Sequence, residues 1–250
     1  MIKHNIQQSF SKAANHYDEL SGLHRRIADE LLMRINPQQS FKHVLDIGCG
    51  TGYLANQLSN AYPRSQVVAI DFAEGMLTEA VAQQHAVNYI QADATQLPFK
   101  TASFDLVVSN LAYQWIEPLD QQFIHLKNIL TDQGQMAIAL FGEATCDELM
   151  QSLTAVGIQP LKRLPNVSAV KKAVEQAGFK SAAITSERVK IQLNNIFELL
   201  SWLKNIGANQ LPIKGFLGRQ KLFVMSEFYR QRFPLNDGIV VSLEVIWIKI

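Results

Sequence analysis

An acid and three glycines occupy every second position of one segment: Asp46, Gly48, Gly50 and Gly52. Asp46 lies near the end of a short apolar run at 43–47, and the glycines follow that run. A short apolar run that ends in glycines is typical of a buried parallel strand followed by a tight loop. Glycine adopts backbone angles that other residues avoid and lets a ligand approach the main chain. Because ligands of open α/β sheets bind outside the carboxyl ends of the strands, this segment predicts a ligand site there.

The order of the expected elements predicts an α/β fold. Further strands are expected at 66–70, 87–91, 104–109 and 135–141, with helices at 53–60, 75–84 and 119–130 between them. Strands separated by helices form βαβ units and a parallel sheet covered on both faces. Helices are also expected within the first forty residues and at 147–156, 168–176, 195–207 and 218–233, with strands at 184–193 and 239–250. We expect one domain over 1–250, with an N-terminal helical cap at 1–40, a cofactor-binding core at 41–142 and a helical lid or insertion at 195–235.

Composition narrows the classes of partner. The 23 Lys and Arg residues nearly balance the 22 Asp and Glu residues, and a phosphate-binding surface would show a basic excess. No run of apolar residues is long enough for a transmembrane helix, and the first twenty residues hold no apolar signal segment. Cys49 and Cys146 lie far apart, without the spacing of a metal site. We therefore expect a cytoplasmic monomer that binds no metal, nucleic acid or membrane.

The glycine spacing indicates which ligand the loop binds. Dinucleotide loops follow the pattern GxGxxG, with a pyrophosphate at the helix N-terminus, whereas the glycines here alternate strictly. An acid, Asp46, stands two residues before the first glycine, which suits a ligand with a positive charge and no phosphate. The amino group and sulfonium of S-adenosylmethionine fit this description. No GK[ST] follows the loop, which excludes a P-loop.

The ends of the next two strands also carry acids. Asp71 stands where an acid can accept hydrogen bonds from ribose hydroxyls, and Asp93, with the adjacent backbone, could read adenine. Met76 could pack against the purine. The predicted cofactor-binding residues are Asp46, Gly48, Cys49, Gly50, Gly52, Asp71, Phe72, Met76, Asp93, Ala94 and Asn110.

Four segments, VLDIGCGTG, VVAIDFAEGML, QADATQLPF and FDLVVSNLAYQW, resemble the class I S-adenosylmethionine-dependent methyltransferases. The resemblance implies a Rossmann-like, seven-stranded, mostly parallel sheet with helices on both faces and an antiparallel last strand. We also expect an N-terminal helix and a small helical lid before that strand. More narrowly, FSKAANHYDEL, SNLAYQW and LKNIGAN followed by GR are similar to the malonyl-[acyl-carrier protein] O-methyltransferase family, over essentially the whole chain.

That family resemblance implies methylation of the free carboxylate of a malonyl thioester in biotin biosynthesis. The acceptor would be malonyl-acyl carrier protein or malonyl-CoA. A carboxylic acid with a pKa of about 3 to 4 is already ionised at neutral pH, so the reaction needs no general base. SNLAYQW agrees with this because it contains no His, Asp, Glu or Lys.

The predicted acceptor-site residues are Tyr17, Gln114, Trp115, Lys204 and Arg219. Each has a plainer interpretation as a packing or solvent-exposed side chain. The scattered histidines, such as His4, His43 and His125, are expected to have no catalytic part. No site residue is predicted between Gln159 and Asn194.

An acyl carrier protein is acidic, so a basic docking patch is expected. Its candidate members are Arg25, Arg26, Lys162, Arg163, Lys171, Lys172, Arg230 and Arg232. Two other functions stay open. One is a methyltransferase of the same fold that acts on another small acid or a quinone-type precursor, and the other is a non-catalytic S-adenosylmethionine-binding protein.

Overall fold

A single large sheet organises the molecule. The computed structural model describes residues 2–36, 38–160, 164–208, 213–214 and 216–250. Its strands are β1 (His43–Ile47), β2 (Gln66–Asp71), β3 (Asn88–Gln91), β4 (Phe104–Asn110), β5 (Leu130–Phe141), β7 (Ala183–Leu193), β9 (Pro234–Leu235) and β10 (Gly238–Lys249). They follow the order β3-β2-β1-β4-β5-β10-β7, with β9 paired to β10. The strands β1 to β5 pair in parallel, and β10 is antiparallel to both neighbours. The expected mostly parallel sheet with an antiparallel last strand is confirmed, and the two-residue β9 adds an eighth strand to the seven expected.

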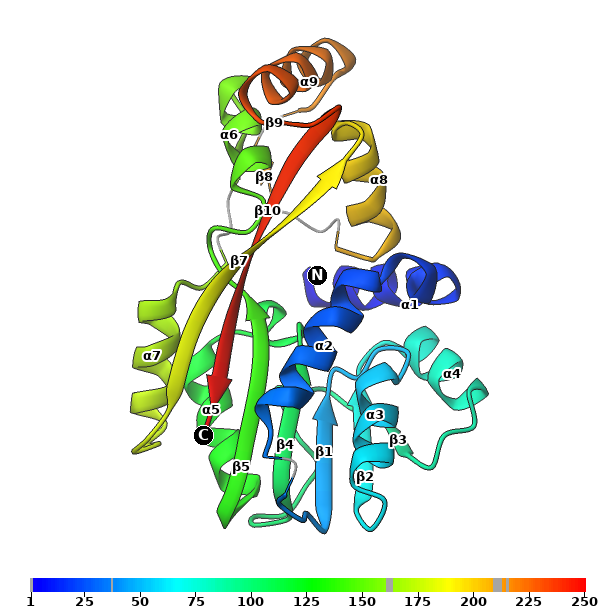
Figure 1. The fold of residues 1–250 in the computed structure, drawn as a ribbon, viewed down its shortest axis with the longest axis vertical. Helices are drawn as coiled ribbons and strands as arrows, with labels where there is room; N and C mark the ends of the chain where they lie inside the picture. The colour runs from blue at the N-terminus through cyan, green and yellow to red at the C-terminus, as the bar shows by residue number, and fades with distance from the viewer. Residues whose placement is uncertain (1, 37, 161–163, 209–212, 215) are drawn as a thin grey trace.

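The helices cover both faces of this sheet (Figure 1). They are α1 (Ile2–Leu20), α2 (Gly22–Arg34), α3 (Tyr53–Ala61), α4 (Glu74–Ala82), α5 (Leu119–Ile129), α6 (Asp147–Ala155), α7 (Val167–Gln176), α8 (Ile196–Asn205) and α9 (Arg219–Arg232). The expected N-terminal helical segment is two helices that break at Ser21. Sequence periodicity also missed the 3-10 turn η1 (Tyr113–Trp115) and a two-stranded ribbon of β6 (Gln159–Pro160) and β8 (Ile213–Lys214). No described helix has the length and apolarity needed to cross a membrane.

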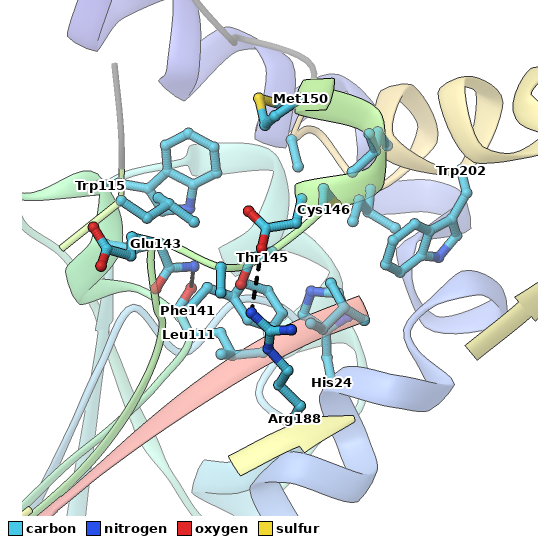
Figure 2. A pocket seen from close by; sticks show the side chains of 18 of the residues that line it. His24, Leu111, Trp115, Phe141, Glu143, Thr145, Cys146, Met150, Arg188 and Trp202 are labelled. Carbon is cyan, nitrogen blue, oxygen red and sulfur yellow. Dashed lines mark hydrogen bonds and ion pairs between the residues drawn. The ribbon is translucent and has the colours of Figure 1, made fainter. Parts of the chain in front are cut away.

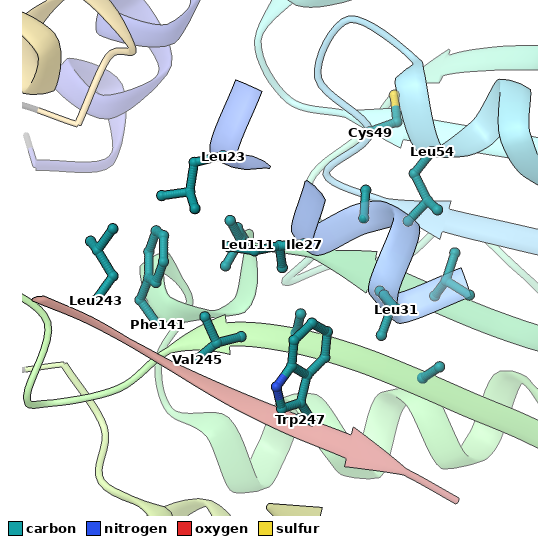
Figure 3. Close-up of a cluster of buried hydrophobic side chains, with 14 of the residues drawn as sticks. Leu23, Ile27, Leu31, Cys49, Leu54, Leu111, Phe141, Leu243, Val245 and Trp247 are labelled. Carbon is teal, nitrogen blue, oxygen red and sulfur yellow. The ribbon is translucent and has the colours of Figure 1, made fainter. Parts of the chain in front are cut away.

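Successive side chains of the central strands point to opposite faces of the sheet. Both faces are buried, which explains why these strands are almost continuously apolar. Val44, Leu106 and Val108 belong to a core cluster shared with α2 and α3. Figure 3 shows part of this cluster, with Leu31 of α2 and Leu54 of α3. Leu45 and Val107 point the other way, into a cluster shared with α5 and α7. Because both faces are buried, the helices hold the strand ends in a rigid frame.

The strand order reverses beside β1, since β2 lies on one side of it and β4 on the other. At such a switch point the loops that leave the two strands diverge and open a crevice. The glycine loop follows β1 and SNLAYQW follows β4, so the fold brings these two segments to the same crevice.

The long pair of β7 and β10 extends beyond the rest of the sheet (Figure 1). β7 pairs with β10 from Ala183 to Leu193, whereas β5 pairs only with Val245–Lys249. The protruding half of β10 carries α6, α8 and α9 at the top of the view. Both helices expected between the last two long strands are present, and α6, from the segment after β5, joins them.

Candidate active site

The glycine loop turns sharply at the carboxyl end of β1. Gly48, Gly50 and Gly52 have φ angles of 72°, 55° and 87°, which L-residues with side chains rarely adopt. A Cβ at Gly48 would lie 2.3 Å from the Cβ of Ala112, so this glycine lets the two crevice loops pack together. A Cβ at Gly50 would meet nothing within 4 Å. The backbone at Gly50 is therefore open to a ligand.

Asp46 is buried in the wall of this crevice. Its side chain belongs to a residue that is 1% exposed, and its Oδ2 has no hydrogen-bond partner among the described residues. Burial and then the charge of Asp71 raise the pKa of this carboxyl to about 8, although a hydrogen bond from the Ala55 amide lowers it. A buried carboxylate is costly without a counter-charge, so the site favours a cationic ligand.

Asp71 supports the loop from the neighbouring strand. One carboxylate oxygen accepts a hydrogen bond from the Gly50 amide at 2.9 Å and the other from the Ala73 amide at 2.8 Å. Burial raises the pKa of Asp71 and these backbone amides oppose the rise. Each carboxylate oxygen has a second lone pair, so Asp71 can brace the loop and still accept a ligand hydroxyl.

Helix α1 lies over the strand ends predicted to hold the adenosine. Gln7 donates a hydrogen bond to the carbonyl oxygen of Phe72 at 2.6 Å. Met76 is buried in a small cluster with Ala14 of α1, against which Phe72 also packs. This region of the predicted cofactor site is therefore covered by the N-terminal helix.

Helix α1 also covers the segment that follows β3. Lys3 of α1 forms an ion pair with Asp93, which also accepts hydrogen bonds from the amide and hydroxyl of Thr95. Burial opposes ionisation, but the hydrogen bonds from Lys3 and Thr95 outweigh it and lower the pKa of Asp93. Ala94 is half-buried against the core on the α5 side of the sheet.

A small cavity of about 50 Å³ is lined by several of the residues predicted to bind the cofactor, including those expected at its methionine end. Asp46, Gly48, Cys49, Gly50 and Asn110 line it together. The Asn110 side chain donates from Nδ2 to the carbonyl of His24 at 3.0 Å, while its buried Oδ1 has no partner among the described residues. Two unpartnered acceptor oxygens beside an open glycine backbone fit the ammonium and sulfonium of S-adenosylmethionine.

A larger cavity of about 850 Å³, seen from close by in Figure 2, shares Tyr17 and His24 with the small one. Its walls come from α1, α2, the loops after β4 and β5, α6, α8, α9, β7 and β10. Six aromatic side chains line it: Phe10, Tyr17, Trp115, Phe141, Trp202 and Phe228. Aromatic walls of this kind keep water away from the part of a ligand that they contact.

Tyr17 and His24 line both cavities and therefore stand between them. The two rings lie 5.8 Å apart, and His24 also contacts Phe141 and Trp202 at ring distances of 6.1 Å and 6.3 Å. Burial lowers the pKa of His24 to about 4, and its buried Nδ1 has no partner among the described residues. Burial, Asp71 and Asp18 raise the pKa of Tyr17, so both side chains are neutral hydrogen-bonding groups at pH 7.

The segment after β4 supplies Gln114 and Trp115 to the larger cavity. Gln114 is buried and donates to the Leu111 carbonyl at 2.7 Å, while its Oε1 has no partner among the described residues. Leu111 itself has a φ of 55°, an unusual value for a residue that is not glycine. Trp115 packs edge-on against Phe10, with ring centroids 5.9 Å apart.

The two basic residues predicted for the acceptor site do not line the larger cavity. Lys204 on α8 and Arg219 at the start of α9 are exposed, and neither is among the residues that line the larger cavity. Among the described residues, the Lys or Arg side chain in that lining is Arg188 of β7, which pairs with Asp147 at 3.2 Å (Figure 2). Sequence reasoning missed Arg188 and His24 because each reaches the cavity only through the packing of distant segments.

Comparisons with known proteins show which family the chain resembles. Residues 45–138 match a family model described as a methyltransferase domain. The malonyl-[acyl-carrier protein] O-methyltransferase of Geobacter sulfurreducens is 30% identical, over 97% of this chain and 96% of the relative. The biotin biosynthesis bifunctional protein BioHC of Cellvibrio japonicus is 33% identical over 98% of this chain, which spans 49% of that protein.

A solved structure supports the fold. A crystal structure of a Bacillus halodurans protein described as a putative methyltransferase superposes with a TM-score of 0.64 at 23% identity, covering 89% of this chain and 96% of that one. The glycine loop, the acids at the strand ends and the similarity over the full length of the chain together identify the family. The chain belongs to the malonyl-[acyl-carrier protein] O-methyltransferase family of S-adenosylmethionine-dependent methyltransferases.

Proposed function

We propose that this protein transfers the methyl group of S-adenosylmethionine to the free carboxylate of a malonyl thioester on acyl carrier protein, in biotin biosynthesis. The observation that carries the proposal is the junction of the two cavities at Tyr17 and His24. On one side lies a small pocket suited to a cation, and on the other an aromatic chamber large enough for an acyl group.

The chemistry suits such a chamber. When bound, S-adenosylmethionine supplies an electrophilic methyl group on a positively charged sulfur. A carboxylate oxygen forms the new C–O bond as the C–S bond breaks, which yields a methyl ester and S-adenosylhomocysteine. Opposite charges are neutralised in this step, so removal of water by aromatic walls helps it. The protein must mainly hold the oxygen in line with the methyl group.

Neutral side chains can hold that oxygen without quenching its nucleophilicity. Tyr17 and His24 stand at the junction, and Gln114 lines the acceptor side. We assign these three to orientation of the malonyl carboxylate, with Trp115 as part of the wall. Asp46 and Asn110 would bind the methionine end of the cofactor, Asp71 the ribose and Asp93 the adenine.

The position of Arg188 makes it the stronger candidate for a cation at the acceptor site than Lys204 or Arg219. Its guanidinium is already paired with Asp147 in the cavity wall. Because Asp147 partly neutralises its charge, Arg188 can attract an anionic acyl group without holding the carboxylate in a tight ion pair. Lys204 and Arg219 would need to act from outside the cavity lining.

A transfer assay tests the proposal. With S-adenosylmethionine labelled in the methyl group, malonyl-carrier protein should acquire label that mild base releases as methanol. Acetyl-carrier protein is the matched control, because it lacks the free carboxylate and should stay unlabelled. Label on acetyl-carrier protein, or in a base-stable product, would contradict carboxyl methylation.

The same assay probes the junction. His24→Phe keeps an aromatic ring but removes its hydrogen-bonding nitrogens, and should lower kcat roughly 10- to 100-fold through lost orientation. His24→Gln keeps a donor and should retain most of the activity. Equal activity of wild type and His24→Phe would show that this side chain only packs.

A further inference from the structure

Helix α9 presents an unusual outer surface at the end of the molecule that carries the cavity (Figure 1). Phe216, just before the helix, is 82% exposed, and Phe223 and Val224 are 67% and 50% exposed. Met225 and Tyr229 on the other side of the helix are fully buried. Three exposed large apolar side chains so close in sequence are more than scattered surface residues, and such patches mark interaction sites.

The same helix is rich in basic residues. Helix α9 contains Arg219, Lys221, Arg230 and Arg232 but one acid, Glu227, which is paired with Arg230 at 2.8 Å. The whole chain has a formal net charge of +1. With four basic residues and one acid, the helix has a net charge of +3, although the protein as a whole is nearly neutral.

The helix also contributes to the acceptor cavity. Phe228 of α9 lines that cavity, as does Met150 of α6. Tyr229 donates a hydrogen bond to the Val240 carbonyl at 2.9 Å and so fixes α9 on β10. A partner seated on the outer face of α9 would therefore dock on a rigid wall of the cavity.

We infer that the exposed surface formed by Phe216 and by Lys221, Phe223, Val224 and Arg232 of α9 docks the acidic acyl carrier protein that delivers the malonyl group. This inference rests on the proposed function. An apolar centre with a charged rim is the usual anatomy of a protein interface, and opposite charges speed and orient the encounter. A lipid surface would match the charge but would bring no thioester to the cavity.

The structure narrows the basic patch expected from sequence. Arg25 is engaged on α2 by Asp18 and lies over the Tyr53 ring. Lys171 and Lys172 are on α7, which lies beside the lower half of the sheet in Figure 1, away from α9 at the top. Lys162 and Arg163 lie outside the described residues. Among the described members, Arg25, the α7 lysines and the α9 arginines therefore do not form one surface, and the α9 members share their helix with the exposed Phe223 and Val224.

Substitutions on α9 test the docking surface. Lys221→Glu and Arg232→Glu should each raise the KM for malonyl-carrier protein at low salt, on the order of fivefold, because attraction becomes repulsion. Phe223→Ser and Val224→Ser should raise it as well. The KM for S-adenosylmethionine and the turnover of malonyl-CoA, which needs no docked protein, should stay the same.

Two matched controls lie away from the cavity. Lys172→Glu makes the same charge change on α7, and Val81→Ser makes the same apolar change on α4, where Val81 is also exposed. The inference is overturned if the α9 variants raise the carrier-protein KM no more than these controls do. It is equally overturned if they alter only self-association in sedimentation or binding to phosphatidylglycerol vesicles.

Failure of the proposed function would look different. In that case wild-type enzyme would methylate neither malonyl-carrier protein nor malonyl-CoA. The docking surface would then be judged by fluorescence anisotropy of labelled malonyl-carrier protein. Weaker binding by Lys221→Glu than by Lys172→Glu would support it, and equal binding would overturn it.

Discussion

Asp46 combines two properties that rarely coexist in a stable protein. Its carboxyl is buried, and one of its oxygens has no partner in the described part of the chain. Proteins keep such costly groups mainly where a ligand completes them. The unfavourable environment of Asp46 in the protein alone is thus the counterpart of its attraction for a cationic cofactor.

This residue predicts a pH dependence with a definite sign. The pKa of Asp46 is raised from 3.8 to about 8, so the native state keeps a proton that the unfolded state has lost between these values. Stability of the cofactor-free protein should therefore fall as pH rises through that window. Asp46→Asn should remove this penalty, and its gain in Tm over wild type should grow from pH 5 to pH 8.

The same variant should bind S-adenosylmethionine far more weakly in calorimetry, because the amide lacks the negative charge. Asp132→Asn, on the exposed part of β5, is the control and should change neither property. Undiminished cofactor binding by Asp46→Asn would remove this carboxylate from the cofactor site.

At the scale of elements, α1 is the helix that closes the cofactor side. Its end is anchored by Asp18, which accepts a hydrogen bond from the Thr51 hydroxyl at 2.6 Å and pairs with Arg25 of α2 at 3.0 Å. Thr51 belongs to the glycine loop and is buried. Asp18 thus links the helix that covers the site to the loop that forms it.

Loss of this link should loosen α1. In Asp18→Ala the buried Thr51 hydroxyl loses its acceptor, at a cost of about 1 to 3 kcal/mol, and amide hydrogen exchange in α1 should accelerate. Asp18→Asn keeps an acceptor oxygen and should show a smaller increase. If exchange in α1 were the same in Asp18→Ala and wild type, the helix would be held by its apolar contacts alone.

At the scale of the whole molecule, the long β10 joins the cofactor half to the acceptor half. The C-terminal part of β10 pairs with β5 in the central sheet, while its N-terminal part contacts α6 and α9. Glu148 of α6 is buried and accepts hydrogen bonds from both the amide and the hydroxyl of Ser242 on β10. Contacts of this kind hold the acceptor wall at a set place relative to the methyl donor.

Glu148→Ala should disturb the acceptor half selectively. It leaves both Ser242 donors without this partner and should lower the free energy of unfolding by about 1 to 3 kcal/mol in urea titrations. The KM for the malonyl substrate should rise while cofactor affinity stays close to wild type. Glu175→Ala, an exposed position on α7, is the control, and an equal loss in both variants would contradict a special role for Glu148.

Much of the fold could be predicted because its signals are local. The strand at 43–47 agrees with β1 residue for residue, and the glycines after it turn where their spacing indicates. Strands β7 and β10 were also found, since apolar alternation identifies a strand without reference to its neighbours. The missed two-residue strands β6 and β8 are too short to carry such a pattern.

The sheet, its helices and the methyl-donor loop could be predicted, because each is encoded in residues that follow one another along the chain. The side chains that meet at the acceptor site could not be predicted in this way. Trp202 joins His24 there from far along the chain, and Lys3 covers Asp93 from ninety positions away. Such meetings depend on how helices pack across the sheet, and no local pattern of residues specifies that packing.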